Sequence, residues 1–174
     1  TGLQTLRRAN TQNTRTETKQ QHECDMILPA ENKTFELSVP ILVIGAGACG
    51  ISAALTANEN GAKVMLLERD DTPSGSSALS TCLIPAAGTK LQAAAGVEDS
   101  VEIFAEDLIA KAKNKSDPDM AYWVAAASGP TVDWLVDTVG LPLSLVTGFK
   151  YPGHSVYRMH GSPNRTGSEL MAVM

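Results

Sequence analysis

Three glycines stand at fixed spacing in the stretch GAGACG at residues 45–50, after an apolar run and before an alanine-rich stretch. In a GxGxxG loop the first glycine permits a tight turn and the second lets the backbone approach a pyrophosphate. The third lets a helix pack closely against a strand. Free N–H groups at the positive end of that helix then face the phosphates. The spacing therefore predicts dinucleotide binding.

A carboxylate, Glu68, ends the next apolar run. At that position it can accept hydrogen bonds from both hydroxyls of an adenosine ribose. It would repel the 2′-phosphate of NADP, which leaves NAD and FAD. Ala54, Gly61 and Val64 complete the pattern GxGxxGxxxAxxxxxxGxxVxxxE, which is far more specific than the glycines alone. The loop by itself does not distinguish NAD from FAD.

The elements that position this loop follow from the hydrophobic pattern. Residues 39–44 and 63–68 are short apolar runs, typical of strands buried on both faces. Residues 48–60 between them favour a helix, and Gly61 can end it in a left-handed conformation. One strand-helix-strand unit of this length predicts a parallel pair with a right-handed crossover. The fold class expected is α/β, with a Rossmann-like domain built on a parallel sheet.

The remainder of the chain divides into an extension and the domain. Residues 1–37 are rich in polar side chains, which predicts a disordered or loosely ordered extension. Residues 38–174 are expected to form the domain. Within it we expect a loop from 70 to 96, a helix over 99–113, helices over 118–128 and 131–139 separated at Gly129-Pro130, short strands over 141–163 and a helix starting at 166.

Composition excludes several classes of protein. The net charge of −5 gives no support to nucleic-acid binding, and no apolar stretch reaches the roughly 18 residues of a membrane-spanning helix. Three cysteines without metal-ligand spacing indicate reduced thiols, so we expect a cytoplasmic protein. The sequence offers no metal site and no catalytic triad. Trp123 and Trp134 lie at apolar helix positions and are expected in the core.

Two later stretches resemble one flavoprotein family. PSGSSALSTCLIPAAGTKLQAAAGVEDS, residues 73–100, is similar to the segment that runs along the flavin in fumarate reductases, succinate dehydrogenase flavoprotein subunits, L-aspartate oxidases and 3-ketosteroid dehydrogenases. YPGHSVYRMHGSPNRTGSELM, residues 151–171, resembles that family's GGHSxxRxH…TG stretch. The resemblance covers about residues 39–174 and implies FAD as the cofactor.

The resemblance also implies a role for particular residues. The pyrophosphate would lie against the glycine loop, the ribose against Glu68, the adenosine beside Arg69, and the flavin with its phosphate arm along residues 76–84. The cofactor-binding residues expected are Gly45, Ala46, Gly47, Ala48, Gly50, Glu68, Arg69, Ser76, Ser77, Leu79, Ser80, Thr81, Cys82, Leu83 and Ile84.

The sequence departs from the family in two places. Ser74 replaces the first glycine of one pair, and Cys82-Leu83 replaces another pair, which would alter contacts to the flavin ring. Some family members bond the flavin covalently to a histidine of this segment. No histidine lies between His22 and His154, so FAD is expected to bind non-covalently.

Activity is expected from the resemblance rather than from visible catalytic groups. His154, Arg158 and His160 could bind an anion, but structural hydrogen bonding is the favoured interpretation. Family members are several hundred residues long, so we expect this chain to be the N-terminal part of such a domain, incomplete at its C-terminus, with apolar surface exposed. A small substrate, a carboxylate or ketone, would bind to parts absent here. An NAD-dependent dehydrogenase and a non-catalytic fragment or binding module are the alternatives.

Overall fold

The computed structural model describes residues 31–174. Most of the extension predicted for residues 1–37 falls outside the described residues, and that expectation stays a prediction. Residues Val39–Met174 form one compact unit, which contains the helices and strands named below. No helix in the described part of the chain is long and apolar enough to cross a membrane.

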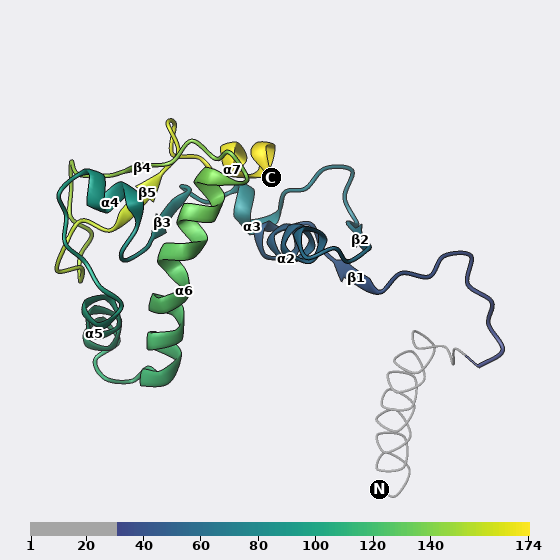
Figure 1. The fold of residues 1–174 in the computed structure, drawn as a ribbon, viewed down its shortest axis with the longest axis horizontal. Coiled ribbons are helices and arrows are strands. Elements are labelled where there is room, and N and C mark those ends of the chain that lie inside the picture. Colours follow the sequence, from purple (N-terminus) through teal and green to yellow (C-terminus); the bar gives the residue numbers. More distant parts are fainter. Residues whose placement is uncertain (1–30) are drawn as a thin grey trace, which may run out of the picture. The chain divides into compact units, whose positions relative to one another are not determined.

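The predicted strand-helix-strand unit is confirmed. β1 (Ile41–Ile44) and β2 (Val64–Leu67) are parallel, with Ile41 opposite Val64. α2 (Ala48–Glu59) connects them and lies against the strand pair (Figure 1). Among residues 31–174, β1 and β2 pair with no other strand, so the expected burial on both faces is not reached. Ile44 is 80% exposed and Leu42 50% exposed, which leaves an apolar strand surface facing solvent.

Residues 70–96 were expected to be a loop, and this prediction was wrong. They contain α3 (Gly75–Ala78), β3 (Leu83–Pro85) and α4 (Lys90–Ala94). β3 is the edge of an antiparallel sheet with order β3-β5-β4, in which β5 (Met159–Gly161) lies between β3 and β4 (Ser144–Leu145). A strand of three residues gains its stability from partners distant in the chain, so its local sequence carries little signal.

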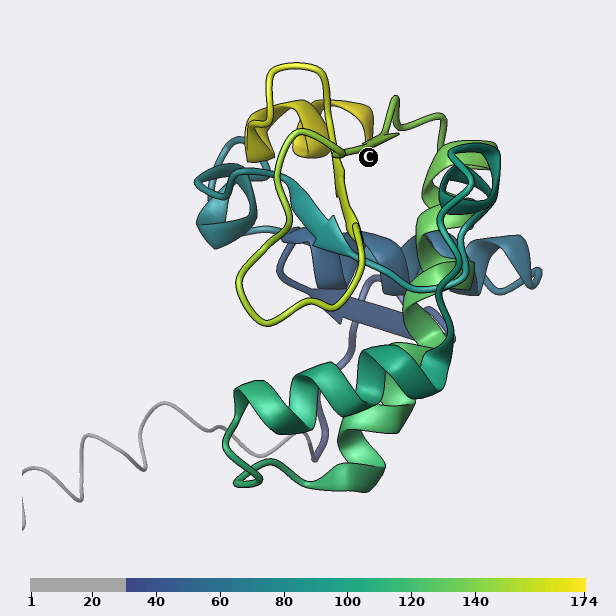
Figure 2. The ribbon, with the colours of Figure 1, turned by 90° about the vertical axis from the view of Figure 1, so that its left-hand side faces the viewer.

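Two helices follow, and the first lies within its predicted bounds. α5 (Val101–Lys111) begins after Ser100, whose hydroxyl accepts from the N–H of Ile103 at 3.2 Å. α6 (Pro118–Asp137) begins after Asp117, with Pro118 at its first position. Figure 2 shows α5 packed across α6, and Phe104, Ala105 and Ala125 form the buried contact between them.

The predicted break at Gly129-Pro130 was wrong, because α6 continues through both residues. Pro130 has no N–H to donate within the helix. The hydroxyls on either side of it donate to helix carbonyls, Ser128 to the oxygen of Ala125 and Thr131 to that of Ala127, both at 2.7 Å. Gly129 is buried against the backbone of Ala87. Tertiary packing thus overrides a local signal that costs about 3 kcal/mol in an isolated helix.

Gly129→Ala is expected to destabilise the protein, although alanine favours an ordinary helix by about 1 kcal/mol. A Cβ atom at Gly129 would lie 2.3 Å from the carbonyl oxygen of Ala87, a backbone atom that cannot rotate away. Overpacking of this kind costs about 1–3 kcal/mol. Urea unfolding should show the loss. Gly148→Ala is the control, since nothing lies within 4 Å of its added Cβ. An unchanged unfolding midpoint for Gly129→Ala would contradict the packing described.

The main core joins α6 to the antiparallel sheet and to the C-terminal helix. Its buried members are Cys82, Ala86, Val132, Leu135, Leu141, Leu143 and Leu170. α7 (Gly167–Val173) contributes Leu170 here and Met171 to a second cluster with Ile51 of α2. Trp134 is half-buried against the main core. Trp123, expected in the core as well, is 77% exposed, so that prediction was wrong. It lies on the face of α6 that neither α5 nor the main core covers.

Candidate cofactor-binding site

The first and third glycines of the loop are required by the packing of the protein itself. Gly45 has φ +99°, a conformation that glycine adopts readily, and its N–H donates to the carbonyl of Leu67 at 2.7 Å. A Cβ at Gly50 would lie 1.9 Å from the carbonyl oxygen of Gly45 and 3.3 Å from Cγ1 of Val43. The start of α2 is therefore in direct contact with the end of β1, as the motif predicts.

The second glycine, Gly47, is different. A Cβ there would approach only the Ser77 hydroxyl, at 3.7 Å, which is an ordinary contact. Its φ of −74° suits any L-residue. Nothing in the described structure therefore requires glycine at this position. The absence of a side chain leaves room beside the N-terminus of α2, where a pyrophosphate would approach.

The carboxylate of Glu68 bonds to the glycine loop. Its Oε2 accepts from the N–H of Ala46 at 2.7 Å, while Oε1 accepts from Arg69 at 2.7 Å and Asp70 at 3.1 Å. These backbone hydrogen bonds, that of Ala46 first, lower the pKa of Glu68. The side chain is exposed, and Oε2, which accepts one bond, can accept a further one, whereas Oε1 already accepts two. Its place beside the loop suits ribose binding, which stays a prediction.

Arg69 does not turn toward the loop in this structure. Its guanidinium pairs with the neighbouring Asp70 at 3.0 Å and is 89% exposed. An exposed pair of adjacent residues contributes little to stability, so the side chain is free to reorient. The predicted contact with adenosine remains untested.

The serine-rich segment reaches the glycine loop through one side chain. The N–H of Ala48, at the start of α2, donates to the Ser77 hydroxyl at 3.1 Å. Ser80 donates to the carbonyl of Ser77 at 2.8 Å and accepts from the N–H of Cys82 at 3.2 Å, which shapes the turn into β3. The other predicted members here are exposed: Ser76, Leu79 and Thr81. Leu79, at 89% exposure, is an apolar side chain with no cover in this unit.

Cys82 occupies a backbone conformation suited to glycine. Its φ is +48°, in the left-handed region, and its side chain is buried in the main core. The family that this segment resembles has glycine here, in agreement with this conformation, because glycine adopts this region at little cost. Leu83 and Ile84 follow in β3 and are half-buried. The bulk of Cys82 thus faces the core.

One residue of this region was missed by the sequence analysis. The N–H of Gly167, at the start of α7, donates to the carbonyl of Ser80 at 2.7 Å. A Cβ at Gly167 would lie 1.8 Å from the carbonyl oxygen of Ser77. α7 is therefore pressed against α3 and fixes the serine segment. The available signal was the capping box Thr166-x-x-Glu169 with a glycine inside it, which marks the helix start but not its neighbour.

Comparison with known proteins decides between the cofactors. Residues 40–174 match the model of a family described as "FAD binding domain". This chain belongs to that family. The family binds FAD, so NAD, which the loop alone left open, is not favoured.

The relatives and solved structures agree with the family. A urocanate reductase of Eggerthella lenta is 34% identical over 84% of this chain and 24% of its own length. A fumarate reductase of Schizosaccharomyces pombe is 36% identical over 68% of this chain and 23% of its own length. The open conformation of a flavocytochrome c3 fumarate reductase superposes with a TM-score of 0.69, at 32% identity over 79% of this chain and 24% of that chain. The structure of a 3-ketosteroid-Δ4-(5α)-dehydrogenase from Rhodococcus jostii RHA1 superposes with a TM-score of 0.69, at 25% identity over 83% of this chain and 36% of that chain. The chain thus spans about a quarter of the length of these curated relatives.

The residues present fit a bound FAD. Gly45 and Gly50 build the turn, Gly47 leaves open space that the protein does not use, and the Ser77 hydroxyl lies at the same helix end. The N–H of Ala48 donates to that hydroxyl. Because the hydroxyl can rotate away, the same N–H is able to donate to a phosphate oxygen instead. The space at this helix end therefore fits an anion without a change in the loop backbone, and binding itself stays a prediction.

A buried ion cluster supports the FAD-binding domain from the opposite end of the antiparallel sheet. Arg158 donates to both oxygens of Asp99 at 2.7 Å and to Asp107 at 2.6 Å, and it lies 4.4 Å from the ring of Phe104. Burial raises the pKa of Asp107, but hydrogen bonds from Arg158 and Ser155 outweigh it, so that the pKa lies below its usual value. This geometry supports the structural interpretation of Arg158 rather than anion binding.

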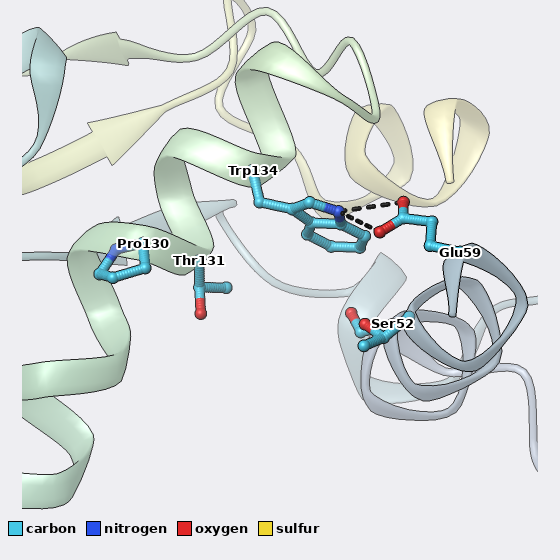
Figure 3. Close-up of a pocket in the computed structure, with 6 residues that line it drawn as sticks. Ser52, Glu59, Pro130, Thr131 and Trp134 are labelled. Atoms are coloured by element: carbon cyan, nitrogen blue, oxygen red, sulfur yellow. Dashed lines mark hydrogen bonds between the residues drawn. The ribbon is translucent and has the colours of Figure 1, made fainter. Parts of the chain in front are cut away.

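A separate open pocket of about 300 Å³ lies between α2 and α6 of the FAD-binding domain (Figure 3). Trp134 extends from α6, and its indole N–H donates to both oxygens of Glu59 at 3.1 and 3.0 Å. In this view Ser52 of α2 lies below the ring, and Thr131 lies to its left, beside Pro130. The contact ties the glycine-loop helix to α6, and the pocket is distinct from the mouth of the glycine loop.

Proposed function

We propose that this chain binds FAD non-covalently and is the FAD-binding portion of an oxidoreductase that transfers hydride to or from an activated C–C bond. The observation that carries the proposal is the space left by Gly47 at the N-terminus of α2. The names of the relatives support the reaction class, since they include a urocanate reductase and several fumarate reductases.

The residues of this chain would act by binding and orientation. Backbone groups of residues 45–50 would hold the pyrophosphate, Glu68 the ribose, and the segment from Ser76 to Ile84 the flavin and its phosphate arm. The helix end lowers the free energy of the bound phosphate charge. When bound, the flavin itself supplies the hydride chemistry, while the protein supplies orientation and electrostatics.

The substrate that we propose is a small molecule with a carboxylate or ketone beside the reacting bond. No residue of this chain is assigned a catalytic role. Groups that polarise the substrate or deliver a proton would belong to the part of the enzyme that the relatives have and this chain does not span. A cytoplasmic location is proposed only on the pattern of cysteines.

The test is a titration of the purified chain with FAD, followed by visible absorption and flavin fluorescence after gel filtration. We expect a flavin band that co-elutes with the protein and is released by denaturation with acid. NAD should not compete. Binding of NAD in place of FAD would return the protein to the dehydrogenase alternative. Binding of neither would favour the non-catalytic alternative and contradict the proposal.

A further inference from the structure

His160, in β5, is a fully buried imidazole for which the proposed function has no role so far. Its Nδ1 lies 3.2 Å from the carbonyl oxygen of Ile84 in β3, and its Nε2 lies 2.9 Å from the hydroxyl of Thr89, which caps α4. The ring therefore bridges two segments that are more than 70 residues before it in the chain.

The partners of the ring indicate which of its nitrogens carries a proton. The carbonyl of Ile84 can only accept, so Nδ1 carries the proton. The Thr89 oxygen already accepts the N–H of Gln92 at 3.0 Å and can donate its own hydrogen to Nε2. Burial lowers the pKa of His160, which agrees with a neutral ring. Every donor in this arrangement then has an acceptor.

The hydrogen bonds continue from Thr89 to the buried ion cluster. Gln92 accepts from the N–H of Thr89 at 3.2 Å and donates to Asp99 at 2.9 Å and to the carbonyl of Tyr157 at 3.0 Å. Asp99 is paired with Arg158. One end of this chain of bonds is thus anchored in a rigid cluster, and the other end holds the carbonyl of Ile84.

The anchored strand and the start of α2 share a core. Cys82 is buried in the main core, and Ile84 of β3 and Ala48 of α2 both pack against that core. Since residues 82–84 and the start of α2 pack on this one core, the placement of β3 affects how the segment lies relative to α2. A shift of this strand would change the space available to a flavin.

We propose that His160 is a positioning residue for the flavin, acting through its hydrogen bond to the carbonyl of Ile84. The inference rests on the FAD binding proposed above. An apolar ring at this position would remove the side-chain hydrogen bonds to the Ile84 carbonyl and the Thr89 hydroxyl. β3 would then be held only by its backbone pairing with β5 and by the bond from the Ala86 N–H to the Arg158 carbonyl, without the side-chain link through Thr89 and Gln92.

Three variants test the role. His160→Phe keeps a ring but removes both hydrogen bonds. His160→Asn keeps an N–H donor close to the position of Nδ1. His154→Phe is the matched control, because it removes a half-buried imidazole of the same segment whose Nδ1 has no hydrogen-bond partner among the described residues. Circular dichroism and thermal unfolding identify any variant that does not fold.

The measurements are FAD affinity by fluorescence titration, the visible spectrum of the bound flavin, and ¹⁵N chemical shifts of the wild-type imidazoles. We expect His160→Phe to weaken FAD binding about tenfold, the equivalent of about 1.4 kcal/mol. It should also shift the flavin band, and His160→Asn should restore both. His154→Phe should change neither. The ¹⁵N shifts should show a neutral Nδ1–H tautomer for His160.

The outcomes separate the two proposals. If the wild-type chain binds no FAD, the proposed function fails, and this inference fails with it. If the wild type binds FAD and folded His160→Phe binds it with equal affinity and an unchanged spectrum, only the positioning role is wrong. A protonated His160, or an Nε2–H tautomer, would contradict the direction of the hydrogen bonds. If His160→Phe does not fold, lost affinity in His160→Asn with an intact fold would equally overturn the inference.

Discussion

Arg158→Met is expected to destabilise the protein by about 3–5 kcal/mol, the usual cost of removing one partner from a buried ion pair. The side chains of Arg158 and Asp99 are fully buried, and Asp107 is 17% exposed. Methionine fills similar volume but leaves both carboxylates without their cation. The free energy of unfolding of a small domain is only about 5–15 kcal/mol, so this single change would remove a large part of it.

Urea unfolding followed by circular dichroism measures this loss, and Arg69→Met is the matched control. Arg69 pairs with Asp70 at the surface, where removal of the cation should change stability by less than about 1 kcal/mol. A second comparison is Arg158→Lys. Lysine keeps the charge but cannot donate to Asp99 and Asp107 at once with the geometry of the guanidinium, so only part of the loss should be recovered. Equal midpoints for Arg158→Met and the wild type would show that the cluster is not a stabilising feature.

Local chemistry made the glycine loop predictable. The strand-helix-strand unit depends on apolar runs and on glycines whose steric roles lie within a few residues of each other. Gly45 and Gly50 occupy the positions that the motif requires, and the ends of α5 and α6 follow from Ser100, Asp117 and Pro118. In each case the determining contact lies within the same element or in the one next to it.

The errors share a different physical origin. β3 exists because β5, more than 70 residues later, pairs with it, and α6 continues through Gly129-Pro130 because Gly129 fits against Ala87. Contacts at such distances leave no periodic trace in the sequence. Trp123 was placed in the core from helical position alone, whereas its side chain is 77% exposed in the described part of the chain.

One part of the candidate site could be predicted from the chemistry of the residues, and another part only from the family resemblance. The phosphate loop follows from steric reasoning on the residues, whereas the segment from Ser76 to Ile84 came only from the family resemblance. The bond from Ala48 to the Ser77 hydroxyl gives that segment a physical connection to the loop. The contact of Gly167 with Ser77 could not be inferred, because nothing in the sequence says that α7 packs on α3.

Gly47→Ala is expected to weaken FAD binding strongly while leaving the fold intact, and Gly50→Ala is expected to disrupt both. The added methyl at Gly47 contacts only a rotatable hydroxyl at 3.7 Å, so the free energy of unfolding should change by less than about 1 kcal/mol. The same methyl fills the space through which a pyrophosphate would reach the helix end. We expect FAD affinity to fall by about a hundredfold or more, the equivalent of at least about 2.8 kcal/mol.

At Gly50 the methyl would lie 1.9 Å from a backbone oxygen, so the contact between β1 and α2 must open. Unfolding curves and FAD titrations on both variants separate these effects. Loss of binding without loss of stability in Gly47→Ala would mean that the second glycine serves a ligand and the third serves the protein. If Gly47→Ala retained full FAD affinity, the phosphates would have to lie elsewhere. The space beside the start of α2 would then be a by-product of the turn, since the protein's own packing does not need it.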